Sequence, residues 1–177
     1  MRRGKTVRDE VRQQRRVRVR QHLASADRPR SGVTTYGTLD MARFDTNLTA
    51  ADDRELRVEF LTVCQSNFTA MDKVVSTCAF NVATGRIQVK PDFVMPDAIS
   101  VNDPTVAMKH MLVTTPFLWG EQTTVDEQDR VTAFLQLVPI DDTEMEYARV
   151  HSPEKLTELL QANQVDILDI NRPSAVA

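Results

Sequence analysis

The sequence is poor in glycine, cysteine and histidine, and each shortage excludes a class of site. Five glycines occur in 177 residues, and they form no glycine-rich phosphate-binding loop. The two cysteines, Cys64 and Cys78, are too few and too far apart for a zinc ribbon, which needs four closely spaced ligands. The three histidines show neither HxxxH nor HxH spacing. We therefore expect no metal ion and no cofactor.

Long apolar segments are also missing. No run of 18 apolar residues exists, so no membrane span is expected, and the basic N-terminus lacks the apolar stretch of a secretory signal. We expect a cytoplasmic protein that does not act at a membrane. Since the cytosol is reducing, Cys64 and Cys78 are expected to be two buried thiols rather than a disulfide.

Charge divides the chain into a basic arm and an acidic body. Residues 1–30 hold eleven Lys and Arg against three acids, whereas residues 31–177 hold eleven bases against twenty-two acids. We predict a basic N-terminal helix and linker over residues 1–32, one domain over 33–174 and a tail over 175–177.

The arm, TVRDEVRQQRRVRVRQHLA (6–24), predicts a helix with a thin apolar stripe and basic remaining faces. Such a helix could attach to nucleic acid, because clustered arginines release counterions from phosphate. It could instead lie on the domain and face its acidic body, which we favour because other features of a nucleic-acid binder are missing.

Three long patterns define the domain. RELRVEFLTVCQ (54–65) alternates and then becomes apolar on both sides, as in a strand that is half buried at first and then fully covered. FTAMDKVVSTCAFNVATG (68–85) has helical spacing of three and four, puts Cys78 on its apolar stripe and stops at Gly85. RVTAFLQLVPI (130–140) is apolar on both sides, which indicates a central strand.

Shorter segments complete the pattern. We expect short strands at GRIQVKPD (85–92), at residues 106–114 and at VDILDI (165–170), and an irregular connection at FVMPDAISVNDPT (93–105) because it holds two prolines. Two further helices are expected near the end of the chain. Asp141, with Glu144 three residues later, can cap the first, and Ser152 followed by Pro153 opens the second. Together these elements predict an α+β fold, a mixed or antiparallel sheet with helices packed on it.

No catalytic constellation emerges. His110 lies among apolar residues in MKHMLV (108–113), which is typical of a neutral core histidine with a hydrogen-bonded ring. The acidic group DDTEME (141–146) resembles a paired acid and base, but carboxylates are also favoured at helix starts by the helix dipole. No GxSxG motif or Cys/His dyad spacing occurs. We therefore predict that the chain is not an enzyme.

Six segments, in this order, resemble the suppressor of fused family. They are TTYGTLD (34–40), RELRVEFLTVC (54–64), AFNVATG (79–85), MKHMLVTTPFLWG (108–120), VTAFLQLVPIDDTEMEY (131–147) and DILDINRPS (166–174), and they span about 140 residues. The resemblance implies a mixed α/β sandwich that binds protein and has no catalytic activity.

The resemblance also implies a kind of partner. Animal relatives with an additional C-terminal domain restrain transcription factors of the Hedgehog pathway by clamping an extended peptide as an added strand. Bacterial single-domain relatives are proposed to be immunity proteins that neutralise toxins delivered between competing cells. This chain looks like the bacterial type, so we expect a cognate toxin as its partner.

By the same resemblance, RIQV (86–89) would receive the peptide strand, which places Arg86, Ile87 and Val89 in the site. Phe80 and Asp92 stand where the family has a tyrosine and an aspartate that contact the peptide; Phe80 lacks the hydroxyl. An alternative is that Phe80 is a core residue and Asp92 a turn residue after a proline.

Two aromatic residues in the segment after His110 allow two interpretations. Phe117 and Trp119 follow a proline at a strand end and could anchor a partner, because tryptophan is enriched among the energetic hot spots of interfaces. They could equally cover one end of the core, which we favour because large aromatics supply much buried area.

Our reading is a protein-binding module that inhibits or sequesters its partner. An acidic body suits an inhibitor of nucleases, because surplus carboxylates accelerate association with a basic cleft. The first alternative is a regulatory adaptor that sequesters an endogenous protein, and the second is nucleic-acid binding through the basic arm. An enzyme is the weakest of the alternatives.

Overall fold

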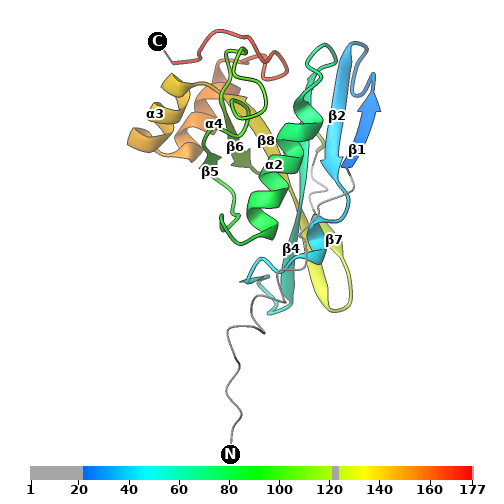
Figure 1. Ribbon diagram of the computed structural model, residues 1–177. Helices are drawn as coiled ribbons and strands as arrows, with labels where there is room; N and C mark the ends of the chain where they lie inside the picture. Colours follow the sequence, from blue (N-terminus) through cyan, green and yellow to red (C-terminus); the bar gives the residue numbers. More distant parts are fainter. Residues whose placement is uncertain (1–21, 121–123, 177) are drawn as a thin grey trace, which may run out of the picture.

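The computed structural model describes residues 22–120 and 124–176, which form one eight-stranded sheet with helices on both faces (Figure 1). The strands are β1 (His22–Ala26), β2 (Val33–Thr38), β3 (Leu48–Thr49), β4 (Glu55–Gln65), β5 (Phe93–Met95), β6 (His110–Thr114), β7 (Thr124–Asp126) and β8 (Arg130–Ile140). The helices are the short 3-10 helix η1 (Met41–Arg43), α2 (Met71–Ala83), α3 (Asp142–His151) and α4 (Pro153–Ala162).

The sheet is built on its two longest strands, β4 and β8, which run parallel side by side. The strand order is β1-β2-β4-β8-β6-β5, with β3 added to β4 and β7 added to β8. The other pairings of the described strands are antiparallel. A mixed sheet with packed helices confirms the predicted α+β fold, and β4 and β8 confirm the two long strands expected from their apolar patterns.

The main core lies between α2 and the sheet. The stripe of apolar residues expected on this helix faces inward, and Met71, Val74 and Cys78 have no exposed surface. They pack with Phe60 of β4 and Leu137 of β8. Each such side chain contributes roughly 1.5–3 kcal/mol when it is fully buried, so this layer supplies much of the stability.

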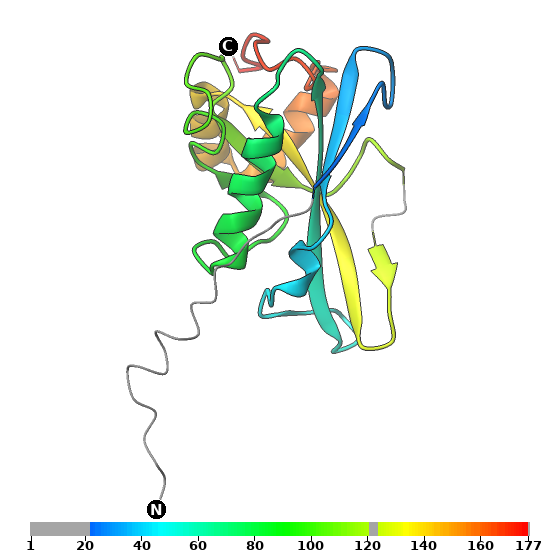
Figure 2. The ribbon, with the colours of Figure 1, turned by 45° about the vertical axis from the view of Figure 1, so that its right-hand side comes forward.

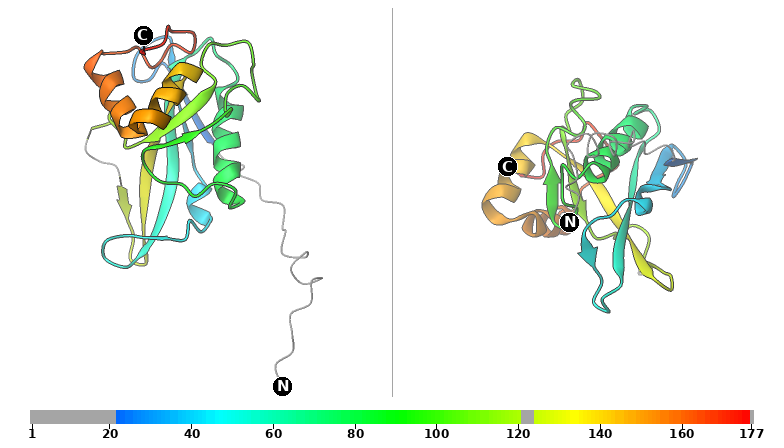
Figure 3. Two further views of the ribbon diagram at one scale, coloured as in Figure 1. Left: turned by 90° about the vertical axis from the view of Figure 1, so that its left-hand side faces the viewer. Right: turned by 60° about the horizontal axis from the view of Figure 1, so that its bottom comes forward.

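A second apolar cluster lies on the opposite face, where α3 and α4 cover β6 and the end of β8. Leu112 of β6 and Ile140 of β8 are fully buried against Leu156 and Leu160 of α4. Figure 3 shows α2 on one side of the sheet and the α3–α4 pair on the other.

The two C-terminal helices begin as the sequence predicts. Asp141 accepts the Glu144 N–H at 2.7 Å, and the Glu144 side chain accepts the Asp141 N–H at 3.2 Å, which forms a reciprocal capping box. Ser152 accepts the Lys155 N–H at 3.3 Å and is followed by Pro153 in the first turn of α4. The carboxylates of Asp141 and Glu144 therefore cap the N-terminus of α3.

A buried ion pair, which the sequence did not reveal, joins α3 to the C-terminal segment. Glu144 is fully buried, and its two carboxylate oxygens accept hydrogen bonds from the Arg172 guanidinium at 2.6 and 2.7 Å. Arg172 also donates to the carbonyl of Pro139 at 3.1 Å, and the Ala175 N–H donates to Glu144 at 2.8 Å. One arginine thus ties together β8, α3 and the chain end.

His110 has the structural role that its surroundings predict. The ring is 2% exposed, its Nδ1 accepts the Asp97 N–H at 2.8 Å, and its Nε2 lies 2.9 Å from Asp142 Oδ1. Because Nδ1 accepts a backbone N–H, the neutral ring carries its proton on Nε2 and donates it to Asp142. His110 therefore fastens the turn after β5 to the first residue of α3.

Of the expectations for short segments, four outside residues 85–92 differ from the structure. Residues 22–24, expected to continue the basic helix, belong to β1, because His22–Ala26 pairs with β2 along its whole length. The rest of the expected helix lies outside the described residues. Phe93–Met95, expected to be irregular, forms β5 and ends at Pro96, while residues 106–109 precede β6 rather than extend it.

The fourth difference is the expected strand at residues 165–170. The carbonyl groups of this segment accept single backbone hydrogen bonds from two separate parts of the chain. The Gln65 N–H donates to the Leu168 carbonyl at 2.9 Å, and the Met108 N–H donates to the Ile170 carbonyl at 3.1 Å. Isolated bonds to separate elements make no ladder, so Ile167 and Ile170 are buried without forming part of a strand.

Removal of Arg172 should strongly destabilise the protein. In an Arg172→Leu variant, Glu144 would be left as a buried carboxylate without its cation, so we expect a loss of about 3–5 kcal/mol in the free energy of unfolding. Urea titration measures this directly. The double variant Glu144→Gln/Arg172→Leu should recover part of the loss, because no charge is then buried. A loss below about 1 kcal/mol, typical of exposed pairs, would contradict this role for the pair.

The cysteines should be unreactive in the folded protein. Both are free and buried, as predicted, and burial raises the pKa of the Cys64 and Cys78 thiols to about 12. Because only the thiolate reacts, we expect a thiol reagent such as DTNB at about pH 8 to label neither until the chain unfolds, and then to label both. Rapid labelling of the native protein, assigned to one site with Cys64→Ala and Cys78→Ala variants, would show that a thiol is accessible.

Candidate protein-binding surface

Helix α2 ends in a turn that uses the backbone amides of the residues after it. Gly85 has a left-handed conformation (φ +69°) and donates its N–H to the Val82 carbonyl at 2.9 Å. The N–H groups of Arg86 and Ile87 both donate to the Asn81 carbonyl, at 3.0 and 3.1 Å. The strand expected at residues 85–92 is therefore wrong, because the first residues after Gly85 close the helix instead.

The next three residues, Gln88–Lys90, form an open backbone segment. Val89 is 1% exposed and packs in the main core, while Gln88 and Lys90 on either side of it are exposed. This alternation of exposed and buried side chains is typical of an extended chain that packs one side against the core. Among the described residues, none of the backbone hydrogen bonds involves Gln88, Val89 or Lys90.

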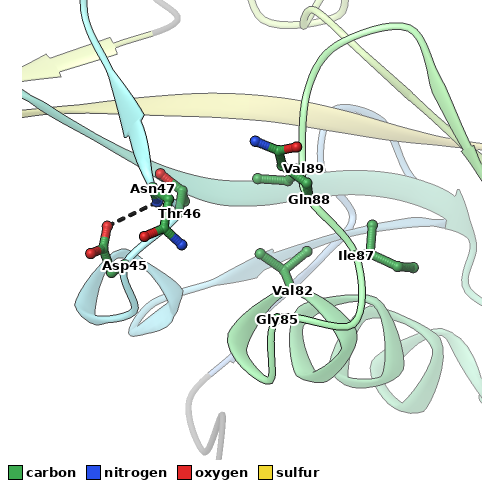
Figure 4. Close-up of a pocket in the computed structure, with 8 residues that line it drawn as sticks. All are labelled: Asp45, Thr46, Asn47, Val82, Gly85, Ile87, Gln88 and Val89. Carbon is green, nitrogen blue, oxygen red and sulfur yellow. Dashed lines mark hydrogen bonds between the residues drawn. The ribbon is translucent and has the colours of Figure 1, made fainter.

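A small cavity separates this segment from the loop before β3 (Figure 4). Its volume is about 140 Å³, and Asp45–Asn47 form the wall opposite Ile87–Val89. The loop is held in shape by the Asn47 N–H, which donates to Asp45 Oδ1 at 2.9 Å. The sequence did not predict this wall, because the loop is distant in the chain and carries no recognisable motif.

Strand β5 continues the open edge. Phe93–Met95 pairs with β6 on one side, and β5 is the last strand of the sheet on the other. A groove of about 340 Å³ runs beside it, between β5 and α3. The residues that line the groove are Lys90, Asp92, Phe93, Val94, Pro96, Met145, Glu146, Ala148, Arg149 and Pro153. We call residues 88–95 together with this groove the edge site.

The edge site has charges of both signs at its rim. Asp92 has a left-handed conformation (φ 55°), which confirms its interpretation as a turn residue. Partial burial raises the pKa of the Asp92 carboxyl, and the negative charge of Glu154 raises it further. Arg149 is held by two hydrogen bonds to Glu146, at 2.7 and 2.5 Å. The middle of the groove is apolar, so it suits an apolar side chain flanked by polar groups.

Phe80 and Arg86 lie together at the end of α2. Phe80 is 37% exposed, so it is a surface residue rather than part of the core. The guanidinium carbon of Arg86 lies 5.3 Å from the centre of the Phe80 ring, within the range of a cation–π contact. The structure thus places both residues at the surface, immediately before the open segment 88–90.

Phe117 and Trp119 belong to a different surface. Phe117 is 37% exposed, Trp119 is partly buried, and neither belongs to the two core clusters. Phe117 and Leu118 line a groove of about 300 Å³ against Leu160 and Ile167, and this groove shares no residue with the edge site. The structure therefore does not bring the seven predicted residues into one site.

The described residues offer neither a metal site nor a membrane-spanning helix. No group of three or more His, Cys, Asp or Glu side chains in residues 22–120 and 124–176 could hold a metal ion. No helix in the same residues is long and apolar enough to cross a membrane. What the described surface offers is an open sheet edge with a groove beside it.

Comparison with known proteins agrees with this architecture. Residues 16–173 match the family model of the suppressor of fused protein (SUFU). The chain is 32% identical over 155 residues to "Immunity protein YqcF" of Bacillus subtilis (strain 168), which covers 87% of this chain and 80% of that protein.

Solved structures show a similar fold at lower identity. A putative SUFU homologue from Neisseria gonorrhoeae FA 1090 has a TM-score of 0.62 at 19% identity, covering 82% of this chain and 71% of that one. A chain of the Sufu–Fu complex has a TM-score of 0.60 at 14% identity, with coverage of 87% and 75%. Drosophila Suppressor of Fused has a TM-score of 0.57 at 13% identity, where the match covers 81% of this chain but 39% of that protein. The family match spans nearly the whole chain and the fold agrees with these structures: the chain belongs to the suppressor of fused family.

Proposed function

We propose that this chain is an immunity protein, which binds a toxin protein in the cytoplasm and neutralises it without any catalytic step. The observation that carries the proposal is the 32% identity to a protein named as an immunity protein, over 87% of this chain. The Sufu–Fu complex supports protein binding as the mode of action, since it is an assembly of a relative with the same fold.

The edge site supplies a physical basis for binding. Residues 88–95 offer two short backbone stretches, 88–90 and 93–95, that Pro91 and the left-handed Asp92 separate, and no neighbouring strand in the described chain occupies their outer side. An extended segment of a partner can pair with such an edge, so that backbone hydrogen bonds provide affinity whatever the partner's side chains.

The groove beside this edge can select the partner. Successive side chains of an added strand point to opposite faces, so alternate side chains would enter the groove between β5 and α3. Met145, Ala148 and Pro153 offer apolar surface there, and Lys90 and Arg149 offer positive charge at the rim. The preferred segment is therefore extended and apolar at alternate positions, and its flanking residues meet a rim with charges of both signs.

A regulatory adaptor would use the same edge, so the two functions differ in the partner and not in the site. The family fold is compatible with either role. The relative's name favours immunity, and a toxin supplied by the same cell lineage is the partner to test first.

Expression of the chain should protect cells from its toxin. We expect a toxin domain encoded beside this gene to arrest growth when it is produced alone in a bacterial host, and growth to be restored when the chain is co-produced. The purified proteins should form a stable complex in size-exclusion chromatography. If the neighbouring gene encodes no toxin and the chain co-purifies from its host with a transcription or housekeeping protein, the adaptor role is correct instead.

Charge reversal at the rim of the edge site should weaken this complex. For the double variant Lys90→Glu/Arg149→Glu we expect roughly tenfold weaker binding, about 1.4 kcal/mol, measured by calorimetry. Lys73→Glu on the exposed side of α2 is the matched control and should bind normally. Equal affinities for all three proteins would place the interface elsewhere.

A further inference from the structure

The cavity between the end of α2 and the loop before β3 shares no residue with the groove beside β5. Figure 2 shows α2 ending close to η1, and the loop that follows η1 supplies one wall of the cavity, residues 45–47. The volume of about 140 Å³ is close to that of an engineered protein cavity, roughly 150 Å³, that holds one benzene molecule. The space therefore suits a single side chain, and we call it the loop cavity.

The two sides of the loop cavity differ in polarity (Figure 4). Val82 of α2 and Val89 are buried, and Ile87 is partly buried, so one side is apolar. The other side is the polar loop, where Asp45 and Asn47 are exposed. A space that is apolar on one side and polar on the other suits a side chain with an apolar stem and a polar end.

The surroundings of the loop cavity are negatively charged. Helix α2 ends here, and its C-terminus carries the negative end of the helix dipole, about half an elementary charge, with no basic residue in the last turn. Asp45 adds a carboxylate on a side chain that is 66% exposed. The Oδ1 atom accepts the Asn47 N–H at 2.9 Å, and Oδ2 takes part in no hydrogen bond among the described residues. A cation is therefore favoured at this end of the cavity.

Two arginines lie near this end, and each has another partner. Arg57 Nη1 lies 3.5 Å from Asp45 Oδ1 without forming a hydrogen bond, and Arg57 Nη2 pairs with Glu55. Arg57 therefore offsets part of the charge of Asp45 from within the chain. Arg86 lies over the Phe80 ring, with its guanidinium carbon 5.3 Å from the ring centre. A cation that enters the loop cavity from outside thus makes a hydrogen bond to Asp45 that neither arginine makes.

We propose that the loop cavity receives one lysine side chain of the partner protein, with its methylene groups against Val82 and Ile87 and its ammonium group at Asp45. A lysine ammonium has three N–H donors and no acceptor, and the Asp45 carboxylate and the Asn47 side-chain oxygen are acceptors on the polar side. The flexible hydrocarbon stem of lysine matches the apolar side. A glutamate would face two negative groups, and a methionine would leave the carboxylate without a cation.

The loop cavity adds a selective contact to the edge site, and its role rests on the proposed function only for the identity of the partner as a toxin. Gln88 and Val89 belong both to the cavity wall and to the open segment 88–90, whose backbone makes no hydrogen bond among the described residues. A partner strand that pairs with this segment directs every second side chain to the same face, so one of them can enter the cavity. The chain's own residues 1–21 hold nine Lys and Arg, so the experiment also has to distinguish this arm from a partner.

The test uses the isotope-labelled full-length chain and three capped synthetic heptapeptides. The first has the sequence Thr-Val-Thr-Lys-Thr-Val-Thr, which favours an extended conformation, and the other two have methionine or glutamate in place of the lysine. Backbone and methyl NMR spectra follow each titration at about 50 mM NaCl. We expect the lysine peptide to shift the signals of the cavity residues Asn47, Val82, Ile87 and Val89 and to bind roughly tenfold more tightly than the methionine peptide. The glutamate peptide should bind most weakly.

Asp45→Asn is the decisive variant, because asparagine keeps an oxygen for the Asn47 N–H and loses only the charge. We expect it to reduce the preference for the lysine peptide over the methionine peptide from roughly tenfold to about twofold, with the affinity for the methionine peptide unchanged. Asp53→Asn is the matched control. It removes an exposed carboxylate from the turn before β4 that does not line the cavity, so the preference should stay the same.

Three results would overturn the proposal. They are equal binding of the lysine and methionine peptides, a lysine preference that Asp45→Asn retains, and the absence of signal shifts at the loop cavity. If Asp45→Asn alone, without any peptide, shifts the signals of residues 1–21, the cavity holds the chain's own arm and the proposal is also wrong. The peptides are measured without a toxin, so the two proposals fail separately. Loss of the lysine preference with growth protection intact refutes only the role of the cavity, and the opposite result refutes only the toxin partner.

Discussion

The buried pair between Arg172 and Glu144 is the interaction on which the position of α3, and of the groove beside it, depends. Glu144 occupies the third position of α3, where it completes the helix cap with Asp141 and also receives Arg172 and the Ala175 N–H. Met145, the next residue, forms part of the groove wall. Arg172, near the end of the chain, therefore fixes the position of that wall. Glu144 is fully buried, so no water molecule can take the place of Arg172 as its partner. His110 adds a second fastening, because its ring links the turn after β5 to Asp142 at the start of the same helix.

These fastenings explain how an open edge can coexist with a stable fold. Val89 and Met95 are anchored in the main core, while Val94 packs with the second cluster, so residues 88–95 are held from two layers. The backbone between these anchors keeps unpaired groups toward the outside. An edge of this kind favours aggregation unless it is short or interrupted, and here β5 is three residues long and is bounded by Pro91 and Pro96. The surface is thus available to a partner but poorly suited to uncontrolled pairing.

Sequence patterns predicted the long elements and the family correctly. Local patterns failed where the structure of a segment is determined by its pairing with residues distant in the sequence. β4, α2 and β8 have repeating apolar residues over ten or more positions, and the caps at Asp141 and Ser152 act within four residues. Residues 22–24 favoured a helix locally, but their pairing with β2 determines their structure. The ion pair of Glu144 joins residues 28 positions apart, and the walls of the edge site come from separate segments, so no local pattern could indicate them.

The central claim is that this chain acts by presenting the edge site to another protein. Hydrogen–deuterium exchange of the full-length chain, free and in complex with its proposed toxin partner, tests that claim most directly. Strand addition predicts that the outward-facing amides of Gln88–Met95 exchange slowly only in the complex, because the partner's carbonyls then accept their hydrogen bonds. Unchanged exchange across all of these amides, in a complex shown to be fully formed, would contradict the account.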